Sequence, residues 1–218
     1  MSYVCFECGS RYEEFSRFCP ICLQFDSFLS EPKGGKVFFQ QRERRVLTAK
    51  ELARKKVAGK IIEGFEFLGE LPSKWTILLW GSPGAGKTTF ALRLSAALGE
   101  KTLFCASEQG YSDSLSKILV DWEIRTDRIL ISDARNLREL RQDIEEFLPS
   151  LLVVDSVNVL GGTLTVDKNI WIVQSTKDGR FRGEQTLAHD VDVMLKIDRE
   201  RIEITKNRFG DTKEVFYG

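Results

Sequence analysis

Residues 75–88 of this 218-residue chain read WTILLWGSPGAGKT, and this stretch decides the fold. Thr76–Trp80 is a short apolar run, which is typical of a central parallel strand buried on both faces. It leads directly into residues 81–88, which follow the pattern G-x-x-x-x-G-K-[ST] of a phosphate-binding P-loop. Apolar residues at helical spacing follow as far as Gly99, so a helix is expected after the loop. Strand, loop and helix together predict an α/β nucleotide-binding core.

The residue types of the loop suit phosphate chemistry. Its glycines let backbone N–H groups approach phosphate oxygens, and the helix that follows adds a positive N-terminal end. Lys87 is expected to bind the β- and γ-phosphates, and the Thr88 hydroxyl is expected to hold Mg²⁺. The predicted nucleotide-binding residues are Gly81, Ser82, Pro83, Gly84, Ala85, Gly86, Lys87, Thr88, Thr89 and, further along the chain, Asp155. ATP or ADP and Mg²⁺ are therefore the expected ligands.

Three later apolar runs each end in a polar side chain. Leu151–Val154 leads to Asp155, the position of a Walker B aspartate that holds the Mg²⁺ shell. The run KTLFCAS leads to Glu108, where a carboxylate can deprotonate the attacking water; an ordinary loop glutamate is the alternative. The run NIWIV leads to Gln174, whose amide is expected to bind the γ-phosphate or the water. Parallel strands deliver such side chains to one edge of the sheet, so we expect them beside the P-loop.

Four of the five cysteines form two C-x-x-C pairs near the N-terminus. Cys5 and Cys8 are separated by ten residues from Cys19 and Cys22. Two such pairs suit tetrahedral zinc bound by four thiolates, and a four-cysteine iron centre is the alternative. A closed site of this kind folds a small module and offers no open position for catalysis. The fifth, Cys105, lies in an apolar run and is predicted to be a small buried residue.

A basic segment follows the cysteine pairs. Residues 42–60 carry eight basic side chains and two acidic ones, and Thr48 is a candidate N-cap for a short helix. A solvated helix face, a phosphate-contacting arm and a linker between subunits are all compatible with this pattern. The predicted divisions of the chain are a zinc-binding module at 1–30, a basic linker or helix at 31–60, and an ATPase domain at 61–218.

The overall composition limits the functional classes. The 32 basic and 32 acidic side chains cancel, so any nucleic-acid-binding surface must be local. No apolar run approaches the roughly 18 to 20 residues of a membrane span, and the N-terminus lacks the apolar region of a signal peptide. We therefore expect a cytoplasmic protein with no membrane partner, in which clustered thiols bind metal.

Taken together, these motifs resemble the bacterial RadA/Sms family of RecA-like ATPases of DNA recombination and repair. The shared features are the cysteine pairs, the P-loop, Ser-Glu after the next strand, V-V-D, T-K-D-G, and the family signature KNRFG at 206–210. The resemblance implies a RecA-like core with a mostly parallel sheet and a C-terminal antiparallel hairpin, beside an N-terminal zinc module. It also implies ATP hydrolysis coupled to movement along single-stranded or branched DNA. Self-association into a ring or filament, such as a hexamer, and a recombinase or helicase partner are further expectations.

The C-terminal stretch IEITKNRFGDTKEVFYG reads as strand, turn and strand. Lys206 and Arg208 are two residues apart, so they are expected on one face. A solvated turn is the simplest interpretation. The resemblance instead implies that both cations act on the nucleotide of a neighbouring subunit, together with Glu108, Lys87 and Gln174, and that they also contact DNA.

The resemblance also places a DNA-binding loop at residues 176–190. Its candidate nucleic-acid residues are Lys177, Arg180, Phe181 and Arg182. Cations around an aromatic ring suit a single strand, because cations bind phosphates and the ring stacks on a base. A solvent loop with one anchoring Phe is the alternative.

The chain also departs from the family pattern. RadA proteins continue into a Lon-protease-like domain, whereas this chain stops at Gly218, so a compact form is expected. Only nine residues, GGTLTVDKN, separate Leu160 from Ile170, where RecA-like proteins carry their first DNA loop and a helix. Nine extended residues span roughly 30 Å, enough to return along a strand of about 17 Å without a helix. The helix expected at 46–58 or a neighbouring subunit would then cover the sheet. A nucleotide-gated, RecA/KaiC-like interaction protein with slow ATPase activity is the alternative function.

Overall fold

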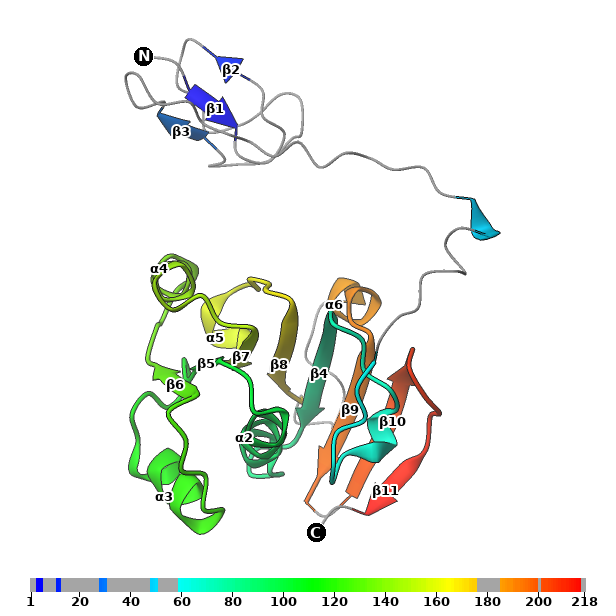
Figure 1. Cartoon of the computed structure of the whole chain (residues 1–218). Coiled ribbons are helices and arrows are strands. Elements are labelled where there is room, and N and C mark those ends of the chain that lie inside the picture. Colours follow the sequence, from blue (N-terminus) through cyan, green and yellow to red (C-terminus); the bar gives the residue numbers. More distant parts are fainter. Residues whose placement is uncertain are drawn as a thin grey trace. The chain divides into compact units, whose positions relative to one another are not determined.

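The computed structural model describes residues 3–5, 11–12, 28–30, 48–50, 59–175, 185–199 and 201–216. The chain divides into two compact units, residues 1–55 and 56–218, each of which is described by itself (Figure 1). In the first unit, three short strands pair antiparallel in the order β2-β1-β3. These strands are β1 (Tyr3–Cys5), β2 (Arg11–Tyr12) and β3 (Phe28–Ser30). Cys5 ends β1, whereas Cys8, Cys19 and Cys22 lie outside the described residues, so the zinc site stays a prediction.

An eight-stranded sheet in the order β11-β10-β9-β4-β8-β7-β5-β6 forms the second unit. The strands are β4 (Trp75–Gly81), β5 (Thr102–Cys105), β6 (Ile129–Ser132), β7 (Leu151–Asp155), β8 (Lys168–Gln174), β9 (Val193–Asp198), β10 (Arg201–Asn207) and β11 (Glu214–Phe216). The six strands from β9 to β6 in this order are parallel, and β10 and β11 are antiparallel to their neighbours. The predicted mostly parallel sheet with a C-terminal antiparallel hairpin is therefore confirmed, and it is consistent with a RecA-like core.

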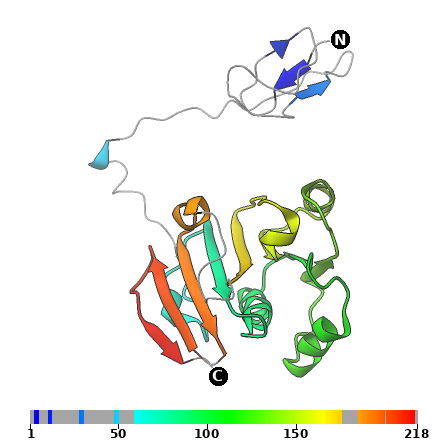
Figure 2. The ribbon, with the colours of Figure 1, turned by 180° about the vertical axis from the view of Figure 1, so that it is seen from behind.

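Helices cover both faces of this sheet (Figure 2). They are η1 (Glu66–Leu68), α2 (Lys87–Leu98), α3 (Asp113–Asp121), α4 (Leu137–Phe147), α5 (Val157–Leu160) and α6 (Gln185–Asp190). One apolar cluster joins α2, α3 and the segment around η1 to one face, and a second cluster joins α4, α5 and α6 to the other. The central strands, buried between these layers, are apolar in nearly every position, which explains the continuous apolar runs in the sequence.

The crossover from β7 to β8 is short. It consists of the single helical turn α5 and residues 161–167, and β8 then pairs with β7 in parallel from Leu151 opposite Lys168. Val157 and Leu160 of α5 are buried in the second apolar cluster, so α5 itself covers part of this face. The expectation that the chain returns without a helix after Leu160 is confirmed, because residues 161–167 lead directly to β8. The predicted covering helix lies mostly outside the described residues, which include only Thr48–Lys50 of it.

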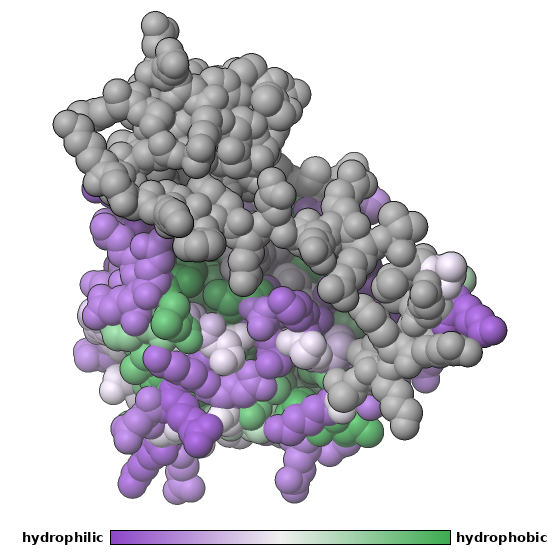
Figure 3. Space-filling model, turned by 45° about the horizontal axis from the view of Figure 1, so that its top comes forward, coloured by the Kyte–Doolittle hydropathy of each residue, from purple (hydrophilic) through white to green (hydrophobic). Residues whose placement is uncertain are grey.

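The surface of the second unit is mainly polar in the view of Figure 3, with small apolar areas between hydrophilic side chains. Among the described residues, none of the helices has the length and apolar character that crossing a membrane requires.

Candidate active site

The P-loop connects β4 to α2 at the carboxyl edge of the parallel strands. Gly81 passes against β9, where a Cβ would lie 2.1 Å from the Ile197 carbonyl oxygen, so only glycine fits there. Gly86 is the N-cap of α2 with φ 94°, a left-handed conformation that glycine adopts without strain. The loop therefore ends with the first N–H groups of α2 at the site, which is the arrangement that binds phosphate.

Lys87 is buried inside this loop, with 7% of its surface exposed. Its Nζ donates to the carbonyl oxygens of Gly81 at 3.0 Å and Ser82 at 2.7 Å. Burial lowers the pKa of Lys87, whereas the carboxylates of Asp155 and Glu108 act in the opposite direction. The ammonium thus lies on the concave side of the loop, where it binds two loop carbonyls that a phosphate could replace.

Thr88 and Asp155 meet across the sheet edge. Thr88 Oγ1 donates to Asp155 Oδ2 at 2.6 Å, and Asp155 is 4% exposed at the end of β7. Burial raises the pKa of Asp155, the Thr88 hydrogen bond lowers it, and the smaller effects of Glu108 and Lys87 oppose each other. A hydroxyl and a carboxylate oxygen fit a Mg²⁺ shell that is completed by waters and phosphate oxygens. Within the described ranges, no cluster of three or more His, Cys, Asp or Glu could hold a metal.

Glu108 and Gln174 form the other half of this edge. Gln174 Nε2, at the end of β8, donates to Glu108 Oε1 at 2.5 Å. The backbone N–H of Glu108 donates to the Asp155 carbonyl at 3.0 Å, and Ser107 Oγ donates to the Ser156 carbonyl at 3.1 Å. The structure therefore brings together the polar ends of β5, β7 and β8 beside the P-loop, as the parallel order of these strands requires.

Lys206 and Arg208 lie near the amino ends of the parallel strands, whereas the P-loop lies at their carboxyl ends. β9 is parallel to β4, with Val193 opposite Ile77, and β10 returns antiparallel so that Asn207 pairs with Val193. The KNRFG motif is thus beside the start of β4, whereas the P-loop follows its end. Within one chain, these cations cannot act on a nucleotide bound at the P-loop.

Both cations are engaged with the end of α6 and the residues after it. Lys206 Nζ donates to the carbonyls of Ala188 at 2.8 Å and His189 at 3.2 Å. These carbonyls are at the C-terminal end of α6, where the helix dipole stabilises a positive charge. Arg208 Nη1 pairs with Asp192 Oδ1 at 2.9 Å, and its Nη2 donates to the His189 carbonyl at 3.4 Å. The expectation of a shared face is therefore met. The simple solvated turn is not, because these side chains bind other parts of the chain.

A β-bulge explains how Lys206 reaches α6. The register of β10 against β9 shifts between Ile204 and Lys206, which leaves Thr205 without an opposite residue. Without the bulge, strict alternation would put Lys206 on the buried face with Ile202 and Ile204. The strand pattern of the sequence did not predict this bulge or the partner Asp192, although an acidic residue before a strand was a visible signal.

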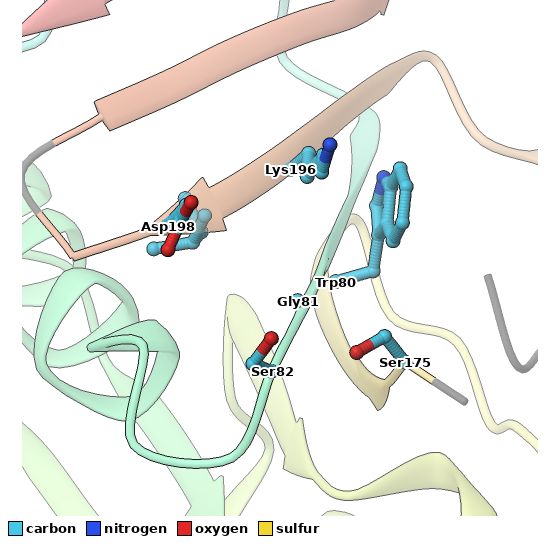
Figure 4. Close-up of a pocket in the computed structure, with 7 residues that line it drawn as sticks. Trp80, Gly81, Ser82, Ser175, Lys196 and Asp198 are labelled. Carbon is cyan, nitrogen blue, oxygen red and sulfur yellow. The ribbon is translucent and has the colours of Figure 1, made fainter. Parts of the chain in front are cut away.

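A small cavity lies on the β9 side of the P-loop. It has a volume of about 220 Å³ and is lined by Trp80, Gly81, Ser82, Ser175, Lys196, Ile197 and Asp198 (Figure 4). Lys196 Nζ lies 5.5 Å from the Trp80 ring centre and pairs with Glu203 at 3.4 Å. Gly81 and Ser82 belong to the predicted P-loop, whereas no sequence motif marks Lys196 or Asp198. The candidate DNA-binding residues Lys177, Arg180, Phe181 and Arg182 follow Ser175 but lie outside the described residues.

Cys105 is fully buried, as predicted, and its Sγ lies 3.6 Å from the Ala134 carbonyl. Burial is the main cause that raises the pKa of its thiol to about 12. Cys105 is therefore a packing residue and not a nucleophile.

Asp155→Asn is expected to abolish Mg²⁺-dependent turnover while raising the melting temperature of the nucleotide-free protein at neutral pH. Because burial raises the folded-state pKa of Asp155, its stabilising contribution is complete below the unfolded pKa of about 4 and is lost as pH rises through the folded pKa. Asparagine avoids this cost and still accepts from Thr88. Melting both proteins between pH 4 and pH 8 checks this, since the difference should shrink towards pH 4. A lower melting temperature for the variant at every pH would contradict it.

The sequence of this chain is similar to those of several proteins that share one name. The chain is 29% identical to the DNA repair protein RadA of Aquifex aeolicus, 26% to that of Chlamydia muridarum and 25% to that of Streptococcus pyogenes serotype M3. Each match covers 98% of this chain. This chain is a homologue of the RadA proteins. The resemblance seen in the motifs is thereby confirmed, although no family model matches the chain.

The match covers only part of the length of the RadA proteins. It takes in 55% to 56% of their length, so the chain spans about half the length of the curated relatives it matches. The alignment with the Aquifex aeolicus RadA extends over 251 positions, more than the 218 residues of this chain. The RadA relatives therefore hold residues inside the matched region that this chain lacks.

Proposed function

We propose that this chain is an ATP-hydrolysing, DNA-processing protein that binds single-stranded or branched DNA in recombination and repair. One observation carries the proposal: Lys87, the Thr88–Asp155 pair and the Glu108–Gln174 pair converge beside one P-loop. These groups match the needs of phosphoryl transfer to water, namely charge stabilisation, Mg²⁺ coordination and a base. The similarity to proteins named DNA repair protein RadA supplies the link to DNA.

In this proposal each residue has a defined task. Lys87 exchanges the Gly81 and Ser82 carbonyls for phosphate oxygens, and Thr88 and Asp155 hold the Mg²⁺ shell. Mg²⁺ neutralises charge on the phosphates when it is bound. Glu108 takes a proton from the attacking water. Gln174, which binds Glu108 here, can turn its amide to the γ-phosphate and so release the carboxylate.

The position of KNRFG requires a second subunit for any catalytic role of its cations. Lys206 and Arg208 lie at the edge opposite the P-loop, so they can reach only the nucleotide of a neighbour. We therefore propose self-association, head to tail, into a ring or filament, in which both side chains leave the end of α6. A recombinase or helicase partner is proposed on the RadA similarity alone.

The N-terminal unit is proposed to bind zinc through Cys5, Cys8, Cys19 and Cys22. The observation that supports it is the pair of C-x-x-C motifs, whose spacing suits four thiolates around one ion. Metal analysis should find one zinc per chain, and iron in its place would contradict the assignment.

The ATPase rate should rise when single-stranded DNA is added, at protein concentrations that allow assembly. DNA binding should weaken as salt rises, because cations that contact phosphates release counterions. Phosphate release with and without a single-stranded oligonucleotide, between about 50 and 200 mM salt, measures both effects. A rate unaffected by DNA, together with no salt-sensitive binding, would favour the nucleotide-gated interaction protein.

A further inference from the structure

Arg135 follows β6 and contacts the loop after β5 that carries Glu108. It lies between β6 and α4, just before Asn136, the N-cap of α4. Its Nη1 donates a short hydrogen bond to the Ser107 carbonyl and a longer one, 3.4 Å, to the Glu108 carbonyl. No motif in the sequence marks this arginine.

Arg135 is itself held in place by α4. Its backbone N–H donates to Glu139 Oε2 at 2.8 Å, and Asn136 Nδ2 donates to Glu139 Oε1 at 2.7 Å. These hydrogen bonds lower the pKa of Glu139, so its carboxylate stays ionised beside Arg135 at neutral pH. The base of the Arg135 side chain is thus fixed to the first turn of a helix.

Gly110 makes room for the guanidinium. A Cβ at this position would lie 2.9 Å from Arg135 Nη2, and Gly110 has φ +60°. Its N–H donates to the Ala106 carbonyl at 2.7 Å, which closes a tight turn around Glu108. The planar guanidinium therefore packs closely against a turn whose left-handed backbone favours glycine.

We propose that Arg135 is a positioning residue for Glu108. This inference rests on the proposed role of Glu108 as the base. The peptide groups on both sides of the Glu108 Cα are held, the N–H by the Asp155 carbonyl and the carbonyls by Arg135. These contacts hold the backbone at Glu108, and the Gln174 amide binds its carboxylate. Bonds from a guanidinium are charge-assisted and stronger than neutral ones, so Arg135 is the main tether on its side.

Loss of the Arg135 hydrogen bonds is expected to lower the rate of hydrolysis. Small misplacements of a reacting group cost up to about 100-fold in rate. Arg135→Ala should therefore lower kcat roughly 10- to 100-fold and leave the KM for ATP within about twofold. Arg135→Lys, which keeps the charge but offers no fork of donors, should restore part of the rate. Millimolar guanidinium added to Arg135→Ala should also raise its rate, which a merely structural role would not produce.

A double-mutant cycle with Glu108→Gln tests the inference directly. Once Glu108→Gln has removed the base, adding Arg135→Ala should cause little further loss of kcat. Arg138→Ala, an exposed arginine in the first turn of α4, is the matched control and should keep the wild-type rate. Additive losses in the cycle, or no response to both Arg135→Lys and guanidinium, would overturn the positioning role. If Glu108→Gln alone leaves kcat unchanged, the proposed function fails instead.

Discussion

Lys87→Ala should abolish ATP turnover and weaken nucleotide binding. The ammonium is the one cation inside the P-loop among the described residues, and it already binds the Gly81 and Ser82 carbonyls where phosphates are expected. Removing a group that stabilises developing charge costs about 10²- to 10³-fold in rate, and the loss of ground-state binding adds to it. Phosphate release under saturating ATP and titration with a fluorescent ATP analogue separate the two effects.

Lys74→Ala is a suitable control for this variant. The Lys74 side chain is 75% exposed and pairs with Asp167 at 2.6 Å before the start of β4, so it lies away from the loop. An exposed pair of this kind contributes at most about 1 kcal/mol, and its loss should leave the ATPase rate unchanged. If Lys87→Ala kept the full rate, the P-loop assignment itself would have to be abandoned.

Glu108→Gln should lower kcat by about 10²- to 10⁴-fold while nucleotide binding persists. The substitution keeps the size of the side chain, and its carbonyl oxygen can still accept from the Gln174 amide. It removes only the ability to take a proton from water. Single-turnover hydrolysis measured alongside nucleotide affinity tests this, because loss of a base should appear in the chemical step alone.

Glu146→Gln in α4 makes the same chemical change on an exposed helix face and should behave as wild type. Should Glu108→Gln instead hydrolyse ATP normally, Glu108 would be an ordinary loop glutamate and another group would have to activate water.

The strands, the P-loop and the order of the candidate residues could be predicted because their signals are local. A buried strand reads as an apolar run, and the residue after it must lie at one sheet edge. The short return from Gly161 to β8 also followed from chain length, whereas the helical turn α5 before it was not predicted. Lys87, Asp155, Glu108 and Gln174 therefore meet as the parallel topology demands.

The remaining features depend on contacts between distant residues, which periodicity does not encode. The partners of Lys206 and Arg208 on α6 arise from a bulge at Thr205 and from the return of β10 past β9. Arg135 reaches Ser107 across 28 positions of sequence, and only the pairing of β5 with β6 brings them together. Spacing alone does not predict the bulge or the Arg135 contact, although Asp192 before β9 was a visible signal for an ion pair.

In the proposed assembly, the placement of the P-loop and KNRFG at opposite ends of the strands would give each subunit a direction. Subunits joined by these two ends repeat one heterologous contact, unlike a two-fold dimer, in which both partners use the same surface. In an open row, the subunit at one end keeps a P-loop that no neighbouring cations complete. Hydrolysis per subunit would then rise with the length of the row, and only closure into a circle would make every site equivalent.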